Sequence, residues 1–245
     1  MVPEIPDDVT GSMLDKTART RLRTLSKDNA EDVARHLVMA GALLDDDPEL
    51  AYAYAQVALL RGGRVDIVRE SAAITAYATG RYAEALREFR TVRRLNGSSE
   101  HLALMADCER GLGRPARALA IAAEPEASTL DRYSSAELAM VVAGARFDLG
   151  DSEAALVTLN AIKAVDAEQQ GRIDNSRADL LELLGRVDEA NAMRAAIPAL
   201  EDEPEPDEDI VVYDVAEDFD APDDDEKRSE EASHQPTAYQ PELED

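Results

Sequence analysis

The chain has 245 residues and a net charge of −26, with 44% hydrophobic residues, 4% aromatic residues and no tryptophan. Its apolar residues are numerous enough for one or two packed domains, but they are mainly Ala, Leu and Val, which favours closely packed helices over a β-sandwich or barrel. The strong negative charge argues against direct binding to a nucleic-acid backbone.

The sequence contains no signal for export or membrane insertion that we can identify. Residues 1–8 carry no basic segment ahead of an apolar run, so no secretory signal is expected. The longest wholly apolar run, near residues 138–145, is far shorter than the roughly 20 residues that a membrane-spanning helix needs. The single cysteine, Cys108, rules out an intramolecular disulfide bond. We therefore expect a soluble, cytoplasmic protein without a membrane partner.

Residues 1–29 form the first predicted segment. Residues 1–10 hold two prolines and three acids and are expected to form an irregular arm. Residues 12–25 place apolar side chains on one helical face, which predicts a helix that caps the end of the following domain. The side chains on that face are Met13, Leu14, Ala18, Leu22 and Leu25.

A turn recurs along residues 30–197, the second predicted segment. Its first residue is Asp46 or a glycine at positions 80, 113, 150 and 185, so the spacings are 34, 33, 37 and 35 residues. An alanine follows five residues later each time, at positions 51, 85, 118, 155 and 190. A near-constant period in this range predicts stacked helical hairpins. The expected hairpins span residues 31–60, 65–95, 100–123, 134–165 and 169–197, with Ser134 or Ser135 as the N-cap of the fourth.

Residues 198–245 form the third predicted segment, an acidic disordered tail. Residues 201–245 hold 20 acids and 2 bases, and such a composition cannot bury enough apolar surface to offset the entropy of ordering. One apolar cluster interrupts it, and we expect this tail motif to be its interacting part. The motif consists of Ile210, Val211, Val212 and Tyr213.

The residues around these turns resemble those of tetratricopeptide repeat (TPR) proteins, whose repeat places small residues at the helix contact, a glycine in the turn and an alanine early in the second helix. The second repeat carries this pattern at Ala72, Ala73, Gly80, Tyr82, Ala85, Phe89 and Val92. The pattern weakens at Asp46, Pro125 and Arg194. The run from Met105 to Pro115 also resembles actinobacterial repeat proteins of unassigned function. The resemblance covers about residues 30–197 and implies an all-α fold, a right-handed superhelix of about five repeats.

The resemblance also implies a concave groove, lined by the first helix of each repeat, that binds an extended peptide or a helix. The corresponding positions here are His36, Ala40, Glu70, Ile74, Tyr77, Asp107, Arg110, Met140, Gly144, Phe147, Asn175, Asp179 and Glu182. The family's carboxylate clamp needs Lys, Asn and Arg, whereas this chain has Glu70, Ile74, Ala103 and Asp107 at such positions. We expect instead a ligand with apolar and basic side chains. The alternative is that the apolar residues of the groove only complete the packing between repeats.

The sequence offers no sign of catalytic or cofactor chemistry. The three histidines, His36, His101 and His234, lie in separate segments and form no helical pair, so no metal site is expected. Cys108 lies on an apolar helix, which indicates a buried structural thiol. Gly-rich phosphate loops, nucleophile elbows and zinc-binding spacings do not occur. We expect no cofactor, no small-molecule substrate and no enzymatic activity.

Four arginines crowd one predicted outer helix, Arg87, Arg90, Arg93 and Arg94. They are either a solvated face or a surface on which the acidic tail folds back, with the tail motif competing for the groove. The preferred function is that of a cytoplasmic adaptor or scaffold that binds a protein partner. The alternative is a regulator whose acidic tail mimics nucleic acid at a basic site of a nucleic-acid enzyme. An enzyme would need a site outside the repeats.

Overall fold

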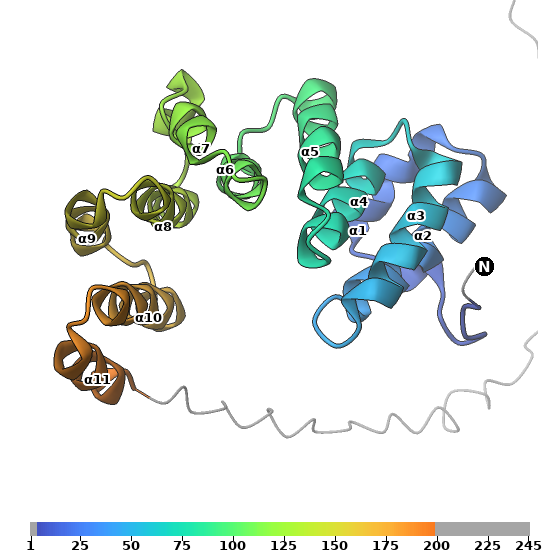
Figure 1. The fold of residues 1–245 in the computed structure, drawn as a ribbon. Helices are drawn as coiled ribbons and strands as arrows, with labels where there is room; N and C mark the ends of the chain where they lie inside the picture. Colours follow the sequence, from blue (N-terminus) through green and yellow to red (C-terminus); the bar gives the residue numbers. More distant parts are fainter. Residues whose placement is uncertain (1–3, 199–245) are drawn as a thin grey trace, which may run out of the picture. The chain divides into compact units, whose positions relative to one another are not determined.

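The computed structural model describes residues 4–198, and within them every regular element is helical (Figure 1). The all-α prediction is therefore confirmed for this part of the chain, which contains no β-strand. The elements are η1 (Gly11–Met13), α1 (Lys16–Arg21), η2 (Leu22–Thr24), α2 (Lys27–Ala42), α3 (Pro48–Gly62), α4 (Asp66–Ala78), α5 (Tyr82–Asn96), α6 (Leu102–Gly111), α7 (Pro115–Ala122), η3 (Pro125–Thr129), α8 (Arg132–Asp148), α9 (Ser152–Ala161), α10 (Ala167–Leu183) and α11 (Val187–Ala196).

Consecutive helices pack as pairs within residues 27–196, namely α2 with α3, α4 with α5, α6 with α7, α8 with α9, and α10 with α11. Each pair also contacts the next pair along the chain, through α3 and α4, α5 and α6, α7 and α8, and α9 and α10. The hairpins expected from the repeat period are thus present.

Four of the turns inside these pairs share one backbone geometry. Gly80, Gly113, Gly150 and Gly185 have φ between +70° and +84°, the left-handed region that glycine tolerates best. At the first of them, Gly80 N donates to Tyr77 O at 2.9 Å and Arg81 N donates to Ala76 O at 2.8 Å. The same two bonds recur at the other three turns and satisfy the carbonyls at the end of the first helix.

The alanine that follows each turn faces the interior, as the sequence pattern predicts. The alanines at positions 51, 85, 118, 155 and 190 are at most 1% exposed, and so are Ala72 and Ala73 on α4. Small side chains at these contacts allow the two helices of a pair to approach closely. The largest buried cluster centres on Phe89 and Leu102 and spans α4 to α8, so it bridges successive pairs.

The turn between α2 and α3 is different because Asp46 stands where the other turns have glycine. Here the chain takes five residues, 43–47, to pass from one helix to the next. Asp47 then caps α3, since its carboxylate accepts a hydrogen bond from Leu50 N at 3.0 Å, and Pro48 occupies the first helical turn.

Two local predictions were wrong. Residues 12–25 do not form one helix, because Asp15 accepts hydrogen bonds from Thr17 N and Ala18 N and starts a new, short helix, α1. Met13 is 59% exposed, whereas Leu22 is buried against α2 and α4. The N-cap of α8 is Asp131 rather than Ser134 or Ser135, since its carboxylate accepts from Ser134 N at 2.8 Å.

The turn glycines can be tested with one substitution. An added Cβ at Gly150 would meet no atom within 4 Å, so only the positive φ of +84° opposes a side chain there. Gly150→Ala should lower the free energy of unfolding by about 1–2 kcal/mol, as measured by urea denaturation.

The matched control is Gly171→Ala, inside α10, where the added Cβ makes only an ordinary contact at 3.7 Å with Ile197. This change should raise stability by about 0.5–1 kcal/mol, because alanine is the better helix former. Equal effects of the two substitutions would show that the left-handed turn conformation is unimportant.

Candidate functional site

An apolar pocket lies between α2 and α4, the first helices of the first two pairs, and its volume is about 230 Å³. It contains three positions that the resemblance assigns to the groove, namely Ala40, Glu70 and Ile74. Its walls are formed by Leu14, Leu37, Ala40, Gly41, Leu44, Ile67, Glu70, Ser71, Ile74 and Thr75. The residues from α4 recur at helical spacing, so one continuous face of this helix borders the pocket.

The pocket is hollow because small residues stand where its walls meet. Gly41 has no side chain, and a Cβ added there would meet nothing within 4 Å. The hydroxyl of Thr75 donates to Ser71 O at 2.8 Å, which leaves its methyl group to the apolar wall. Glu70 is the one charged residue in the lining, and its carboxylate favours a basic group beside an apolar one.

His36, a predicted groove residue, does not face an open surface. It is 3% exposed, and its Nδ1 lies 2.7 Å from the carbonyl oxygen of Asp32, one turn earlier in α2. The ring packs edge-on against Tyr54 of α3, with the centroids 6.1 Å apart. His36 therefore belongs to the interior of the first helix pair.

Three further groove positions, Tyr77, Asp107 and Arg110, are joined to one another. The Tyr77 hydroxyl donates to Asp107 Oδ2 at 2.6 Å, and Arg110 donates to Asp107 Oδ1 at 2.8 Å and to Asp148 Oδ2 at 2.8 Å. These bonds connect α4, α6 and α8. Burial and the Asp107 carboxylate raise the pKa of Tyr77, so its phenol stays protonated as the donor.

Gly144 supplies the space for Arg110. A Cβ at Gly144 would lie 2.5 Å from Cζ of Arg110, so only glycine admits the guanidinium at this point of α8. A polar hollow of about 480 Å³ lies beside it, lined by Tyr82, Asp107, Arg110, Gly111, Gly113, Pro115 and Asp148. Asp107 and Asp148 both bind Arg110, so these three charged side chains of the hollow offer few free hydrogen-bonding groups to a ligand.

The remaining predicted groove residues lie on α8 and α10. Met140 and Phe147 are half-buried against the cluster of Ala143, Ala155, Leu159 and Leu180, which joins α8, α9 and α10. On α10, Asn175 is exposed, whereas Asp179 and Glu182 both accept hydrogen bonds from Arg194 of α11 at 2.7 Å. Met140 and Phe147 thus contribute to packing between pairs, in line with the alternative stated for them.

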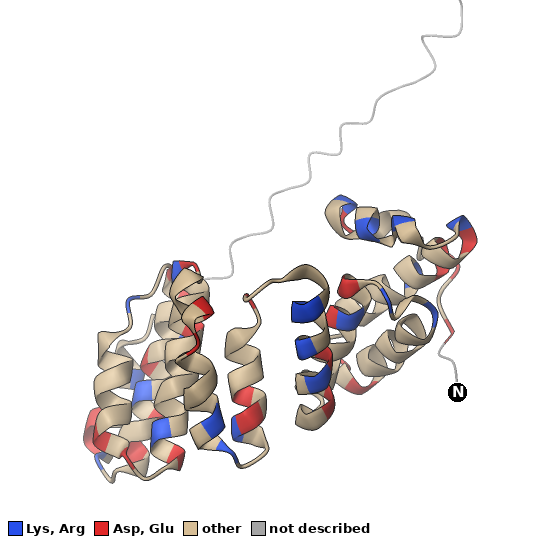
Figure 2. Ribbon diagram, turned by 90° about the horizontal axis from the view of Figure 1, so that it is seen from above, with Lys and Arg blue, Asp and Glu red and all other residues tan. Residues whose placement is uncertain are grey.

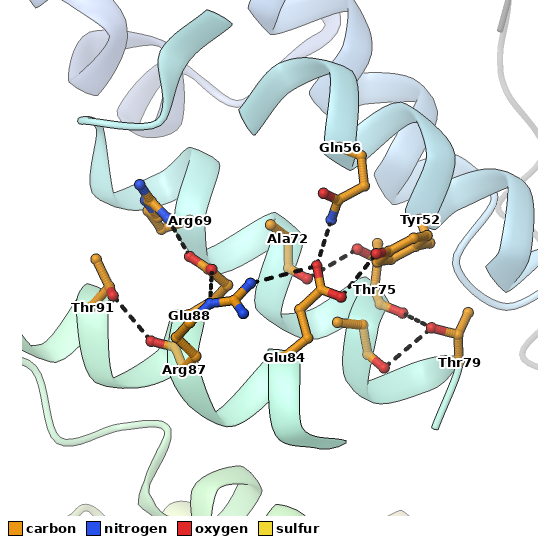
Figure 3. Close-up of polar contacts among 11 residues, drawn as sticks. Tyr52, Gln56, Arg69, Ala72, Thr75, Thr79, Glu84, Arg87, Glu88 and Thr91 are labelled. Carbon is orange, nitrogen blue, oxygen red and sulfur yellow. Dashed lines mark hydrogen bonds and ion pairs between the residues drawn. The ribbon is translucent and has the colours of Figure 1, made fainter. Parts of the chain in front are cut away.

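Three of the four arginines of α5 are paired with acids within the described chain. Figure 2 marks the positions of basic and acidic residues along the ribbon, and Figure 3 shows Arg69 and Arg87 beside Glu88. Glu88 is 2% exposed at its side chain and accepts from Arg69 of α4 at 2.5 Å and from Arg87 at 2.9 Å. Glu109 of α6 is equally buried and accepts from Arg90 at 2.9 Å. The ion pair between Arg69 and Glu88 connects the two helices of one pair, α4 and α5. The ion pair between Arg90 and Glu109 connects α5 to α6 of the next helix pair.

Arg93 extends this arrangement, since it lies 2.6 Å from Glu124 and 3.1 Å from Glu126 beyond α7. Three of the four arginines of the predicted basic surface are therefore engaged locally, and Arg94 is exposed. The four arginines of α5 therefore do not form a free basic surface, because acidic partners on α5 itself, on α6 and beyond α7 pair with three of them.

Sequence reasoning missed the two buried acids, although a signal for them exists. Glu88 shares the inward stripe of α5 with Ala85, Phe89 and Val92, at intervals of three, four and seven residues. An acid on an apolar stripe predicts a buried carboxylate, and burial of a carboxylate requires a basic partner.

Cys108 is buried, as the sequence predicts, and burial raises the pKa of its thiol to about 12. A thiol that stays protonated at neutral pH is a poor nucleophile. None of the helices in residues 4–198 is both long and apolar enough to cross a membrane. The tail motif at residues 210–213 lies outside the described residues.

Comparisons of the chain with protein-family models, with curated proteins and with solved structures gave no match. The resemblance to TPR proteins therefore rests on the residue pattern alone.

The buried ion pair of α4 and α5 offers a stability test. Arg69→Ala leaves the Glu88 carboxylate buried without its partner on α4, so the free energy of unfolding should fall by about 3 kcal/mol in urea denaturation. The matched control is Arg186→Ala, which breaks the exposed pair with Glu189 and should have little effect. Similar small losses for both variants would show that Glu88 gains nothing from Arg69.

Proposed function

We propose that the chain is a non-catalytic protein-interaction module of the tetratricopeptide repeat type, acting as a cytoplasmic adaptor or scaffold. In this proposal the helix pairs stack as a right-handed superhelix, and the first helices hold a peptide or helix of a partner protein. Support comes from the common turn geometry at four glycines and from the buried alanines that follow them.

The observation that carries the proposal is the apolar pocket between α2 and α4. A pocket of about 230 Å³ accommodates one large aliphatic or aromatic side chain. Glu70 at its border favours a lysine or arginine close to that side chain in the bound segment. The expected ligand is therefore a short segment in which an apolar residue stands next to a basic one.

The pocket also narrows the binding region relative to the full set of groove positions. Tyr77, Asp107 and Arg110 satisfy one another, and Met140 and Phe147 pack between helix pairs. Ala40, Glu70 and Ile74 all line the same pocket, whereas Asn175 is exposed on α10 and lies outside it. We place the main contact with the partner on α2 and α4.

In this proposal the acidic tail competes with the partner segment for the pocket. The tail motif at residues 210–213 is apolar and belongs to the same chain as the pocket, so tethering gives it a high effective concentration there. Contact with the arginines of α5 is not required, because three of them already have acidic partners.

A large side chain at the edge of the pocket should weaken binding without harming the fold. Gly41 is exposed and borders the pocket, so Gly41→Leu adds a large apolar side chain at the edge of the pocket, and the change also favours the helix. We expect an array of short peptides containing Leu or Phe beside Arg or Lys to yield ligands whose affinity, measured by fluorescence anisotropy, falls about tenfold or more in this variant, a loss of about 1.4 kcal/mol.

Gly171→Leu is the control, since it makes the same exchange on α10, away from the pocket. Its peptide affinity should equal that of the unmodified chain. Peptides that bind Gly41→Leu as well as the unmodified chain would contradict the assignment of the pocket.

Deleting the tail distinguishes its two candidate roles, as a competitor for the pocket or as a mimic of nucleic acid. A chain truncated after Leu200 should bind the selected peptides several-fold more tightly, because its tethered competitor is gone. Unchanged affinity would exclude competition. Partner binding that is strongly salt-sensitive and is lost with the tail would instead favour the alternative, an acidic regulator that mimics nucleic acid.

A further inference from the structure

Three potential metal ligands meet where α4 lies beside the start of α6. His101 is the N-cap residue of α6, Glu100 precedes it, and Glu70 lies on α4. The Nε2 atom of His101 is 3.3 Å from Glu70 Oε1 and 3.5 Å from Glu100 Oε1. One ligand atom from each residue lies within 4.8 Å of the others. The expectation of no metal site rests on the spacing of the histidines, whereas here a single histidine meets Glu70, which lies 31 residues earlier in the chain.

The Nε2 atoms of His36 and His101 are both buried without a hydrogen-bond partner among the described residues, but only that of His101 has two carboxylates within 3.5 Å. Buried polar atoms without a partner are rare and call for an explanation. Two carboxylate oxygens lie within 3.5 Å, yet neither is placed for a good hydrogen bond with this nitrogen. Phe89 helps to hold the imidazole in this position, with the two ring centroids 5.1 Å apart.

The distances from His101 Nε2 to the two carboxylate oxygens fit metal coordination better than hydrogen bonding. Ligand bonds of about 2.0–2.1 Å in a tetrahedral zinc site place neighbouring donor atoms roughly 3.3–3.4 Å apart. In such a site the metal lies on the lone-pair direction of the imidazole nitrogen, and the oxygens of the other ligands lie to the side of it. These oxygens therefore make poor hydrogen bonds with the nitrogen. The two distances measured from Nε2 are close to this spacing.

The chemistry of the three ligand side chains, two carboxylates and one imidazole, indicates which cation would bind. Calcium and magnesium ions prefer six or more oxygen ligands, whereas imidazole with carboxylates suits zinc. Two carboxylates also balance the charge of one divalent cation. Glu100 is 55% exposed at its side chain, so the ion has a path from solvent and a water molecule can supply the fourth ligand.

We propose that Glu70, Glu100 and His101 form a Zn²⁺ site that links α4 to the start of α6. The ion would join the second helix pair to the third and would satisfy the buried nitrogen of His101. Because Glu70 also lines the apolar pocket, zinc bound there would compete with a basic residue of a partner for its carboxylate. The site stands on these contacts alone and does not depend on the proposed partner.

The test is calorimetric titration of the full-length chain with Zn²⁺ in a chelator-free buffer. We expect one site above the weak binding of the acidic tail, and His101→Ala should lower its affinity by roughly tenfold or more through loss of a ligand. His234→Ala is the matched control, since His234 lies outside the described residues, and it should leave the affinity unchanged.

Glu100→Gln covers the possibility that His101→Ala unfolds the chain, because Glu100 is largely exposed. It should also weaken the site, whereas Glu168→Gln, an exposed acid at the start of α10, should not. The proposal is overturned if the unmodified chain shows no site above tail binding, if His234→Ala removes it, or if Glu100→Gln leaves it intact.

Discussion

The described fold depends on a left-handed turn residue followed, five positions later, by a buried alanine. At Gly80 and Ala85, and at three later copies, the turn reverses the chain and the alanine lets the second helix approach the first. A larger side chain at either position would separate the helices or strain the turn. Because the spacing between turn and alanine is constant, the four pairs from α4 to α11 start from the same turn geometry, and their remaining positions are free to differ.

Buried electrostatic contacts then hold the helices together, both within a pair and between pairs. Glu88 and Glu109 are as buried as apolar core residues, and Arg69 and Arg90 reach them from the preceding helices. Such pairs specify which surfaces meet, because a misplaced contact would leave a buried carboxylate without a partner. The chain of bonds through Tyr77, Asp107 and Arg110 is a similar device on the first helices. It also removes these residues from the set that can readily bind a partner.

Backbone features of this fold could be read from the sequence because they depend on local chemistry. Gly80 and Ala85 act through their own size and conformation, so their spacing alone predicts a turn and a contact. The N-cap of α8 was assigned wrongly because Asp131 competes with Ser134 and Ser135, and local propensity does not decide among them. The burial of His36 and the ion pairs of the α5 arginines depend on residues of other helices. The short distance between Glu70 and His101 also depends on the packing of different helices. Sequence spacing contains no information on such distances, and the hollow beside Gly41 is equally a product of packing.

The central claim is that α2 and α4 together form the surface that binds a partner segment. Methyl NMR of the full-length chain, titrated with a bound peptide, tests it most directly, because Leu37, Ile67 and Ile74 all line the pocket. The account predicts that the methyl signals of these residues shift most and that those of Leu159 and Leu180, in the cluster of α8 to α10, stay in place. Shifts centred on α8 to α10, with the signals of Leu37, Ile67 and Ile74 unchanged, would contradict it.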